Sequence, residues 1–400
     1  MKRRYLVHIE EPKHTEGWIE LAAVHESPDG ARWRVWYRVP EAWGDALTDL
    51  ADPSAVGSVQ QAMLHGSDLE VRGAVSRSLL ANLEDYVDVW HCWDGTNYSR
   101  IELGATRETE PEPSTSGEAI CSFSGGVDSY FTVLRHAKRL AGRRSKDIGA
   151  AVLVHGFDIP LGDTSGFQGA FARAAEGLHH FAIPLIPVVT NWRDNGIDWL
   201  NSFGSAATAC LHLFQRRFRS GLIASSETYA YQAPQGASPL IDRMLSNSSF
   251  EIIHDGAGFT RSQKVALLAP ETELVRRLRV CWEGEQRDRN CGVCEKCIRT
   301  ILNFRAIGCA KPEVFPTDVT IDQIRRIPIR NMPILNEFRE IAAEAGRQGM
   351  GKERWVAALQ RRLRKAQREL ASPPRFQAIK KTAVWQALRK IRNKVRNRAS

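Results

Sequence analysis

The sequence predicts an α/β protein whose central unit is a parallel sheet with helices on both faces. Short apolar runs alternate with helical patterns from residue 119 onward, which is typical of strands joined by crossover helices. The composition, 43% hydrophobic and 25% charged residues, lies near globular averages, and 400 residues suffice for two to three domains. We expect an N-terminal α+β domain at 1–107, a linker at 108–118, the α/β domain at 119–310 and a helical extension with a basic tail at 311–400.

The first unit is rich in tryptophan, and we expect its aromatic residues to be core side chains rather than a binding face. Alternating apolar residues predict strands at Tyr5–Glu10, Trp18–Val24, Arg32–Val39, Val87–Trp93 and Ile101–Thr106. Helical spacing predicts helices at Pro53–His65 and Ala74–Tyr86. The polar, proline-containing stretch Glu108–Gly117 is typical of an exposed linker.

The second unit, residues 119–310, contains the alternating strand and helix patterns. Strands are predicted at Ala119–Phe123, Gly149–Val154, Leu185–Thr190, Leu222–Ala224 and Phe250–His254. The helical patterns between them cover Asp128–Ala141, Gly166–His180 and Gly204–Phe218. The carboxyl ends of such strands meet at one edge of the sheet, where open α/β sheets bind ligands.

Charge is distributed unevenly along the chain. The last fifty residues hold 16 Lys or Arg and only Glu353 and Glu369, whereas residues 1–350 hold 39 basic and 44 acidic residues. No apolar run reaches the length of a transmembrane helix, so we expect no transmembrane segment and a cytoplasmic location. Eight cysteines, three of them clustered, favour metal binding over a disulfide scaffold.

The stretch Cys121–Ser129, which reads CSFSGGVDS, leaves the first strand of the second unit and enters a helix. Consecutive glycines allow backbone amides to approach an anion closely, and the helix N-terminus adds unpaired N–H donors. The expected phosphate contacts are the hydroxyls and amides of Ser124, Gly125, Gly126, Val127 and Ser129, with Asp128 as a Mg²⁺ ligand. The alternative is an ordinary glycine-rich turn between strand and helix.

Two further patterns bear on ligands. Gly346–Lys352 matches the first seven positions of a Walker loop, but Glu353 occupies the Ser/Thr position and a helix precedes it, so we expect a helix–helix loop. Four cysteines with the spacing C-x9-C-x2-C-x2-C can present four thiolates to one Zn²⁺. Buried metal-free thiols and an iron–sulfur cluster are the alternatives. The metal ligands would be Cys281, Cys291, Cys294 and Cys297.

The glycine loop resembles the pyrophosphate loop of the ATP-pyrophosphatase (PP-loop) superfamily, which has an adenine nucleotide alpha hydrolase-like fold. Together with the cysteine cluster and the following Trp282-Glu283-Gly284, it resembles the 7-cyano-7-deazaguanine synthase branch over residues 119–308. The resemblance implies ATP, Mg²⁺ and Zn²⁺, and an AMP-forming ligase that adenylates a carboxylate or amide oxygen for attack by ammonia or another amine. Where that branch usually carries Lys, this chain has Arg261.

Within this hypothesis, Asp128, Arg261 and Lys264 are the catalytic candidates, and the backbone of His155 is placed to contact adenine. A simple strand-to-loop turn is the other interpretation of His155. Ser226, Glu227 and Thr228 follow the fourth strand of the second unit and are the candidate substrate contacts. Two other functions stay open: insertion of sulfur or nitrogen into a tRNA base, and a non-catalytic ATP-binding sensor or scaffold.

The basic tail, residues 352–400, predicts two amphipathic helices separated by Ser372-Pro373-Pro374. Apolar residues recur at helical spacing in both halves, beginning with Trp355 and with Ile379. The tail could bind nucleic acid, an anionic membrane or an acidic partner, or it could be a solvated arm docked by its apolar stripe.

Overall fold

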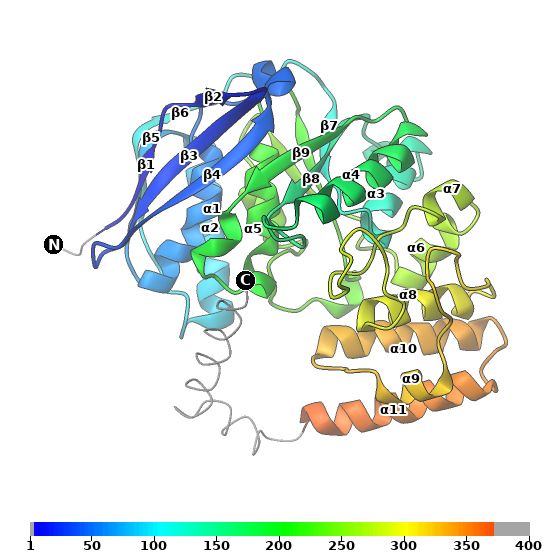
Figure 1. The fold of residues 1–400 in the computed structure, drawn as a ribbon. Helices are drawn as coiled ribbons and strands as arrows, with labels where there is room; N and C mark the ends of the chain where they lie inside the picture. Colours follow the sequence, from blue (N-terminus) through cyan, green and yellow to red (C-terminus); the bar gives the residue numbers. More distant parts are fainter. Residues whose placement is uncertain (1–3, 372–400) are drawn as a thin grey trace.

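Strands from both halves of the chain form one sheet in the computed structural model, which describes residues 4–371 (Figure 1). The strands are β1 (Tyr5–Ile9), β2 (Lys13–Thr15), β3 (Trp18–Glu26), β4 (Arg32–Pro40), β5 (Leu69–Ser76), β6 (Leu103–Thr109), β7 (Ala119–Ser122), β8 (Ile148–His155), β9 (Leu185–Thr190), β10 (Ser220–Ala224) and β11 (Glu251–Asp255). The eleven strands have the order β11-β10-β7-β8-β9-β4-β3-β1-β5-β6, and β2 pairs with β3. The α/β class is therefore confirmed.

Eleven α-helices accompany the sheet within residues 4–371. They are α1 (Asp52–His65), α2 (Arg77–Asp94), α3 (Val127–Ala137), α4 (Thr164–His179), α5 (Trp199–His212), α6 (Arg261–Leu268), α7 (Thr272–Val275), α8 (Glu295–Ala306), α9 (Ile321–Arg326), α10 (Met332–Arg347) and α11 (Arg354–Ala371). None of the helices in the described part of the chain is both long and apolar enough to cross a membrane.

The second half of the sheet is parallel, as expected. From β11 through β10, β7 and β8 to β9, every neighbouring pair runs in the same direction. Its side chains alternate between two cores: Ala119 and Cys121 lie in one, and Ile120 lies in the other. The first core includes residues of α3, α4 and α6, and the second includes residues of α1, α2 and α5. Helices therefore cover both faces of the parallel strands.

The N-terminal strands extend this sheet instead of forming a second one. Strand β4 pairs antiparallel with β9, with Tyr37 opposite Thr190. A buried carboxylate, Asp52, accepts hydrogen bonds from Gln215 Nε2 at 3.1 Å and from Asn247 Nδ2 at 2.9 Å. Backbone pairing and buried polar contacts thus join the two units on either side of the predicted linker.

One predicted strand of the first unit is wrong. Residues Val87–Trp93 belong to α2, and the predicted helix Ala74–Tyr86 begins inside β5. The buried side chains Leu79, Leu83, Tyr86 and Trp90 of α2 recur every three or four residues, which is the helical period. Val87, Val89 and the tryptophans have high strand propensity, but burial of one helix face decides the structure.

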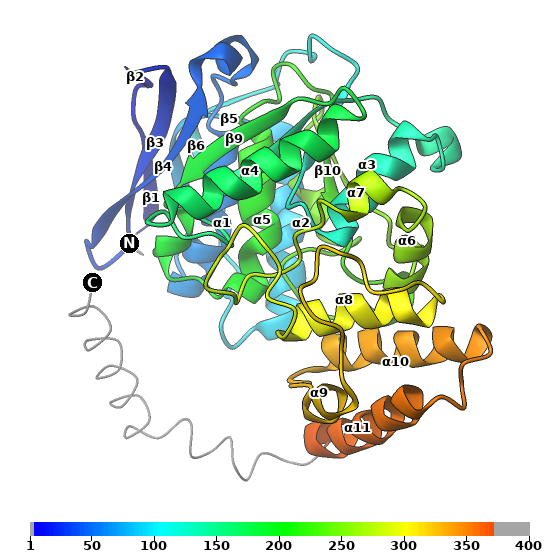
Figure 2. The ribbon, with the colours of Figure 1, turned by 45° about the vertical axis from the view of Figure 1, so that its right-hand side comes forward.

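The C-terminal helices form a layer below α6 (Figure 2). Helix α10 packs between α8 and α11, and α9 contacts α11. The glycine-rich stretch 346–352 begins in the last turn of α10 and continues into the loop that leads to α11, so the expected helix–helix loop is confirmed. Helix α11 is the first of the two expected basic helices, whereas the second, from Ile379, lies outside the described residues.

Candidate active site

The loop between β7 and α3 has the backbone that its glycines predict. Gly125 has a φ of +75°, a left-handed conformation that favours glycine, and Gly126 is the extended N-cap of α3. Because glycine has no side chain, Gly126 cannot cap the amides of the first turn of α3 with a side-chain hydrogen bond. Such a turn leaves amide donors for a ligand, and the helix dipole favours a negative one. The residues present therefore fit a phosphate group.

The serines of the loop differ in accessibility. Ser124 is exposed, and its Oγ accepts a hydrogen bond from the Gly126 amide at 3.3 Å. Ser129 is buried, and its Oγ donates to Gly126 O at 3.1 Å. The Ser124 hydroxyl is thus the one that can reach a ligand directly, and the Ser129 hydroxyl stabilises the turn.

Asp128, in the first turn of α3, is paired with two cations from α6. Its Oδ2 lies 2.8 Å from Arg261 Nη1, and its Oδ1 lies 3.1 Å from Lys264 Nζ. Burial opposes ionisation of Asp128, but the two cations outweigh it and lower the pKa of the carboxyl group. The expected catalytic trio therefore lies together, with a carboxylate that stays ionised and two cations that could share their charge with a phosphate.

Helix α6 holds these cations because its start is fixed by a capping box between Thr260 and Gln263. The Lys264 ammonium also donates to Ser225 O, just beyond β10, and lies 5.7 Å from the centre of the Phe131 ring. Only 1% of the Lys264 side chain is exposed. Lys264 thereby connects the first turn of α3 to the segment after β10.

The predicted substrate segment has two buried oxygens without a hydrogen-bond partner among the described residues: Oε2 of Glu227 and Oγ1 of Thr228. Burial, and then the nearby Glu337, raises the pKa of Glu227 to about 7, while Arg299 opposes the shift. Ser226 is exposed. Unpaired buried polar atoms are costly, so a ligand with hydrogen-bonding groups would fit this position.

His155 ends β8, next to β7 in the sheet. Its imidazole is buried, stacks on the Phe167 ring with centroids 4.5 Å apart, and has Nε2 2.9 Å from Pro160 O. Burial lowers the pKa of His155. The side chain is thus engaged in the strand-to-loop turn, and only the backbone is left for the expected adenine contact.

The four cysteines of the cluster lie together at the N-terminus of α8. Their sulfur atoms are all within 4.8 Å of one another. Cys281 Sγ is 3.7 Å from Cys294 Sγ, and Cys291 Sγ is 3.9 Å from Cys297 Sγ, close to the edge of about 3.8 Å in a tetrahedron with Zn–S bonds of about 2.3 Å. Amides of Gly284 and Cys294 point at cluster sulfurs at 3.3 Å. The group could hold a metal ion such as zinc.

Arg279 connects the cysteine cluster to the glycine loop, and the sequence analysis missed it. Its amide donates to Gly125 O at 2.8 Å, and its Nη2 donates to Ser124 O at 3.1 Å. Its Nη1 donates to the carbonyls of Cys281 and Arg287, each at 3.3 Å. Burial lowers the pKa of Arg279. The one feature of the sequence that could have identified Arg279 is its position two residues before Cys281, the first cysteine of the cluster.

Three more charged residues surround the site and were also missed. Arg299 Nε lies 3.1 Å from Glu295 Oε1, and Arg299 Nη1 lies 3.5 Å from Glu337 Oε2. Arg299 and Glu295 belong to α8 and Glu337 to α10, so the approach of Arg299 to Glu337 depends on helix packing that no local motif specifies.

Comparisons with family models, curated proteins and solved structures find no match to the chain.

Proposed function

We propose that the protein is an ATP-dependent, AMP-forming enzyme that activates a carboxylate or amide oxygen for attack by a nitrogen nucleophile. One observation carries the proposal: the ionised Asp128 lies in the first turn after Gly125-Gly126 and contacts both Arg261 and Lys264. Glycine amides, a helix N-terminus, a carboxylate and two cations are the groups that a magnesium-bound triphosphate requires. The resemblance to the PP-loop superfamily supports the same chemistry.

In this proposal, catalysis is positioning and charge neutralisation. The amides of Gly125, Gly126 and Val127 and the Ser124 hydroxyl hold the pyrophosphate that leaves, and Arg261 and Lys264 balance its charge. Asp128 would hold Mg²⁺, which supplies further neutralisation when bound. A substrate oxygen attacks the α-phosphorus, and the acyl substrate is held beside Glu227 and Thr228.

The cysteine cluster has a structural role in this scheme. Four thiolates fill the coordination of a zinc ion and leave no open position for a substrate. The metal would instead fix the segment 281–297, to which Arg279 joins the glycine loop.

The decisive experiment incubates the protein with Mg-ATP, ammonium and a panel of carboxylates that includes deazapurine carboxylates, and identifies the nucleotide product. AMP with pyrophosphate is expected, whereas ADP with phosphate contradicts the proposal. Asp128→Asn should abolish turnover. Asp147→Asn, which removes an exposed aspartate paired with Arg139, is the matched control and should leave turnover unchanged.

Insertion of sulfur or nitrogen into a tRNA base is the second candidate, favoured by the basic C-terminal helix. Of the two, nitrogen fits better, because burial raises the pKa of Cys121 to about 12 and its thiol stays protonated at neutral pH. Cys121 lies within β7, directly before the loop. ATP binding without turnover on any substrate would instead favour the sensor or scaffold.

A further inference from the structure

Helix α11 has two chemically opposite faces. Its apolar stripe, which includes Trp355, Val356, Leu359 and Leu363, is buried in the core that also contains residues of α8 and α10. The opposite side carries Arg361, Arg364, Lys365 and Arg368, all of them exposed. The helix is thus docked by its apolar stripe, and its cationic side faces away from that core.

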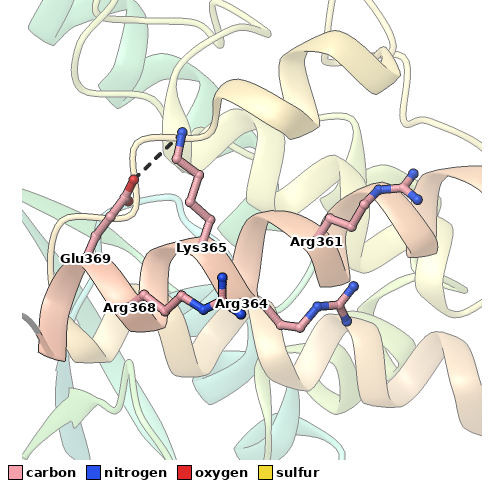
Figure 3. A pocket seen from close by; sticks show the side chains of 5 residues that line it. All are labelled: Arg361, Arg364, Lys365, Arg368 and Glu369. Carbon is pink, nitrogen blue, oxygen red and sulfur yellow. Dashed lines mark ion pairs between the residues drawn. The ribbon is translucent and has the colours of Figure 1, made fainter.

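These four cations and Glu369 line a shallow hollow on α11 (Figure 3). Positions 361, 364, 365 and 368 are separated by three or four residues, so they share one face of the helix. Lys365 Nζ is 3.8 Å from Glu369 Oε1. Within residues 4–371, neither Arg361 nor Arg364 has a carboxylate at ion-pair distance, and Figure 3 shows both side chains extending in the same direction. We call this surface, defined by Arg361, Arg364, Lys365 and Arg368, the basic face.

We propose that the basic face binds the phosphate backbone of a nucleic acid. A membrane-surface helix needs its apolar residues for insertion, but those of α11 are already buried in the core. The sequence that follows, residues 372–400, contains nine Lys or Arg and no Asp or Glu. Guanidinium groups match phosphate geometry, and three of the four cations of the basic face are arginines.

The dimensions of the basic face fit several phosphates. Seven residues separate Arg361 from Arg368, which corresponds to about 10 Å along a helix. A nucleic acid strand rises about 3.4 Å per phosphate, so about three phosphates span that length. Contacts with three phosphates of a duplex give a slope of log Kobs against log salt of about −3.

The test uses the full-length protein and fluorescence anisotropy with a labelled RNA duplex and a DNA duplex of the same sequence, over a series of KCl concentrations. Binding of either duplex with a slope of about −3 or steeper is expected. Arg361→Glu combined with Arg364→Glu should weaken binding at least about tenfold and reduce the slope by about 2. Both residues are exposed, and an unchanged melting temperature will show that the variant is folded.

The matched control is Arg143→Glu combined with Arg144→Glu, which changes the net charge equally on an exposed turn of another part of the surface. It should leave the affinity within about twofold. Three results would overturn the proposal: no binding of either duplex at the lowest salt, equal losses in both double variants, or capture of phosphatidylserine vesicles without capture of RNA or DNA. None of these measurements involves ATP, so the outcome is independent of the proposed enzymatic activity.

Discussion

Replacing Asp128 by alanine should destabilise the fold, because Asp128 is the carboxylate partner of two buried cations. Only 8% of the Arg261 side chain and 1% of the Lys264 side chain are exposed. Removing one partner of a buried ion pair typically costs about 3–5 kcal/mol. Lys264 keeps the Ser225 carbonyl as an acceptor, and 19% of the Asp128 side chain is exposed, so we expect the lower end, about 3 kcal/mol.

Urea unfolding followed by circular dichroism measures this loss. Asp147→Asn, which removes an exposed ion pair, is the control and should change the free energy of unfolding by less than about 1 kcal/mol. Because the two cations lower the pKa of Asp128, its contribution is present above the pKa of the unfolded chain, about 3.9, and disappears as the pH falls through the lower folded pKa. A loss for Asp128→Ala below about 1 kcal/mol at neutral pH would refute the role of Asp128 as the centre of this charge cluster.

Three other changes test the remainder of the site. Cys291→Ser combined with Cys294→Ser should remove the bound metal, measured by emission spectrometry, and lower the melting temperature; equal melting with and without metal would show that the cluster does not stabilise the fold. Arg279→Lys keeps the charge but cannot bridge Ser124 O and Cys281 O, so binding of a non-hydrolysable ATP analogue with Mg²⁺, measured by calorimetry, should weaken about tenfold or more while the metal content is retained. Glu227 has a raised pKa of about 7, so the native state binds a proton that the unfolded chain has already released, and stability falls as the pH rises from about 4.5 to about 7. Glu227→Gln should flatten the melting temperature over that range, and an unchanged pH profile would contradict the burial of an ionisable Glu227.

The parallel strands could be predicted because local and global signals agree there. The strands from β7 to β11 are short apolar runs bounded by turn residues, and their side chains contribute to the two cores on opposite faces of the sheet. The N-terminal unit was harder to predict. The pairing of β4 with β9 depends on two registered residue pairs between segments more than 150 residues apart, for which no local pattern exists. In α2, strand propensity and helical periodicity conflicted, and burial of Leu83, Tyr86 and Trp90 favoured the helix.

The same distinction applies to the candidate site. Residues inside a contiguous motif, such as Gly125, Asp128 and the four cysteines, could be identified because their spacing alone limits their geometry. Arg299 and Glu337 approach each other only through the packing of α8 against α10, so their ion pair could not be predicted from the sequence. Lys264 was predicted as a candidate catalytic residue, but its contact with Ser225 O, which joins α6 to the segment after β10, required the tertiary structure.

The glycine loop and the cysteine cluster are best understood as one mechanical unit. A loop with a left-handed glycine and an uncapped helix start has few interactions of its own, and its carbonyls need donors when they are turned away from a ligand. Arg279 supplies these donors to Gly125 O and Ser124 O, and it is held in turn by the Cys281 and Arg287 carbonyls. A metal that fixes Cys281 therefore limits the motion of Arg279 and, through it, of the loop. If the proposed function holds, this connection would give a structural metal its role: it would preorganise the loop amides that are proposed to bind the triphosphate.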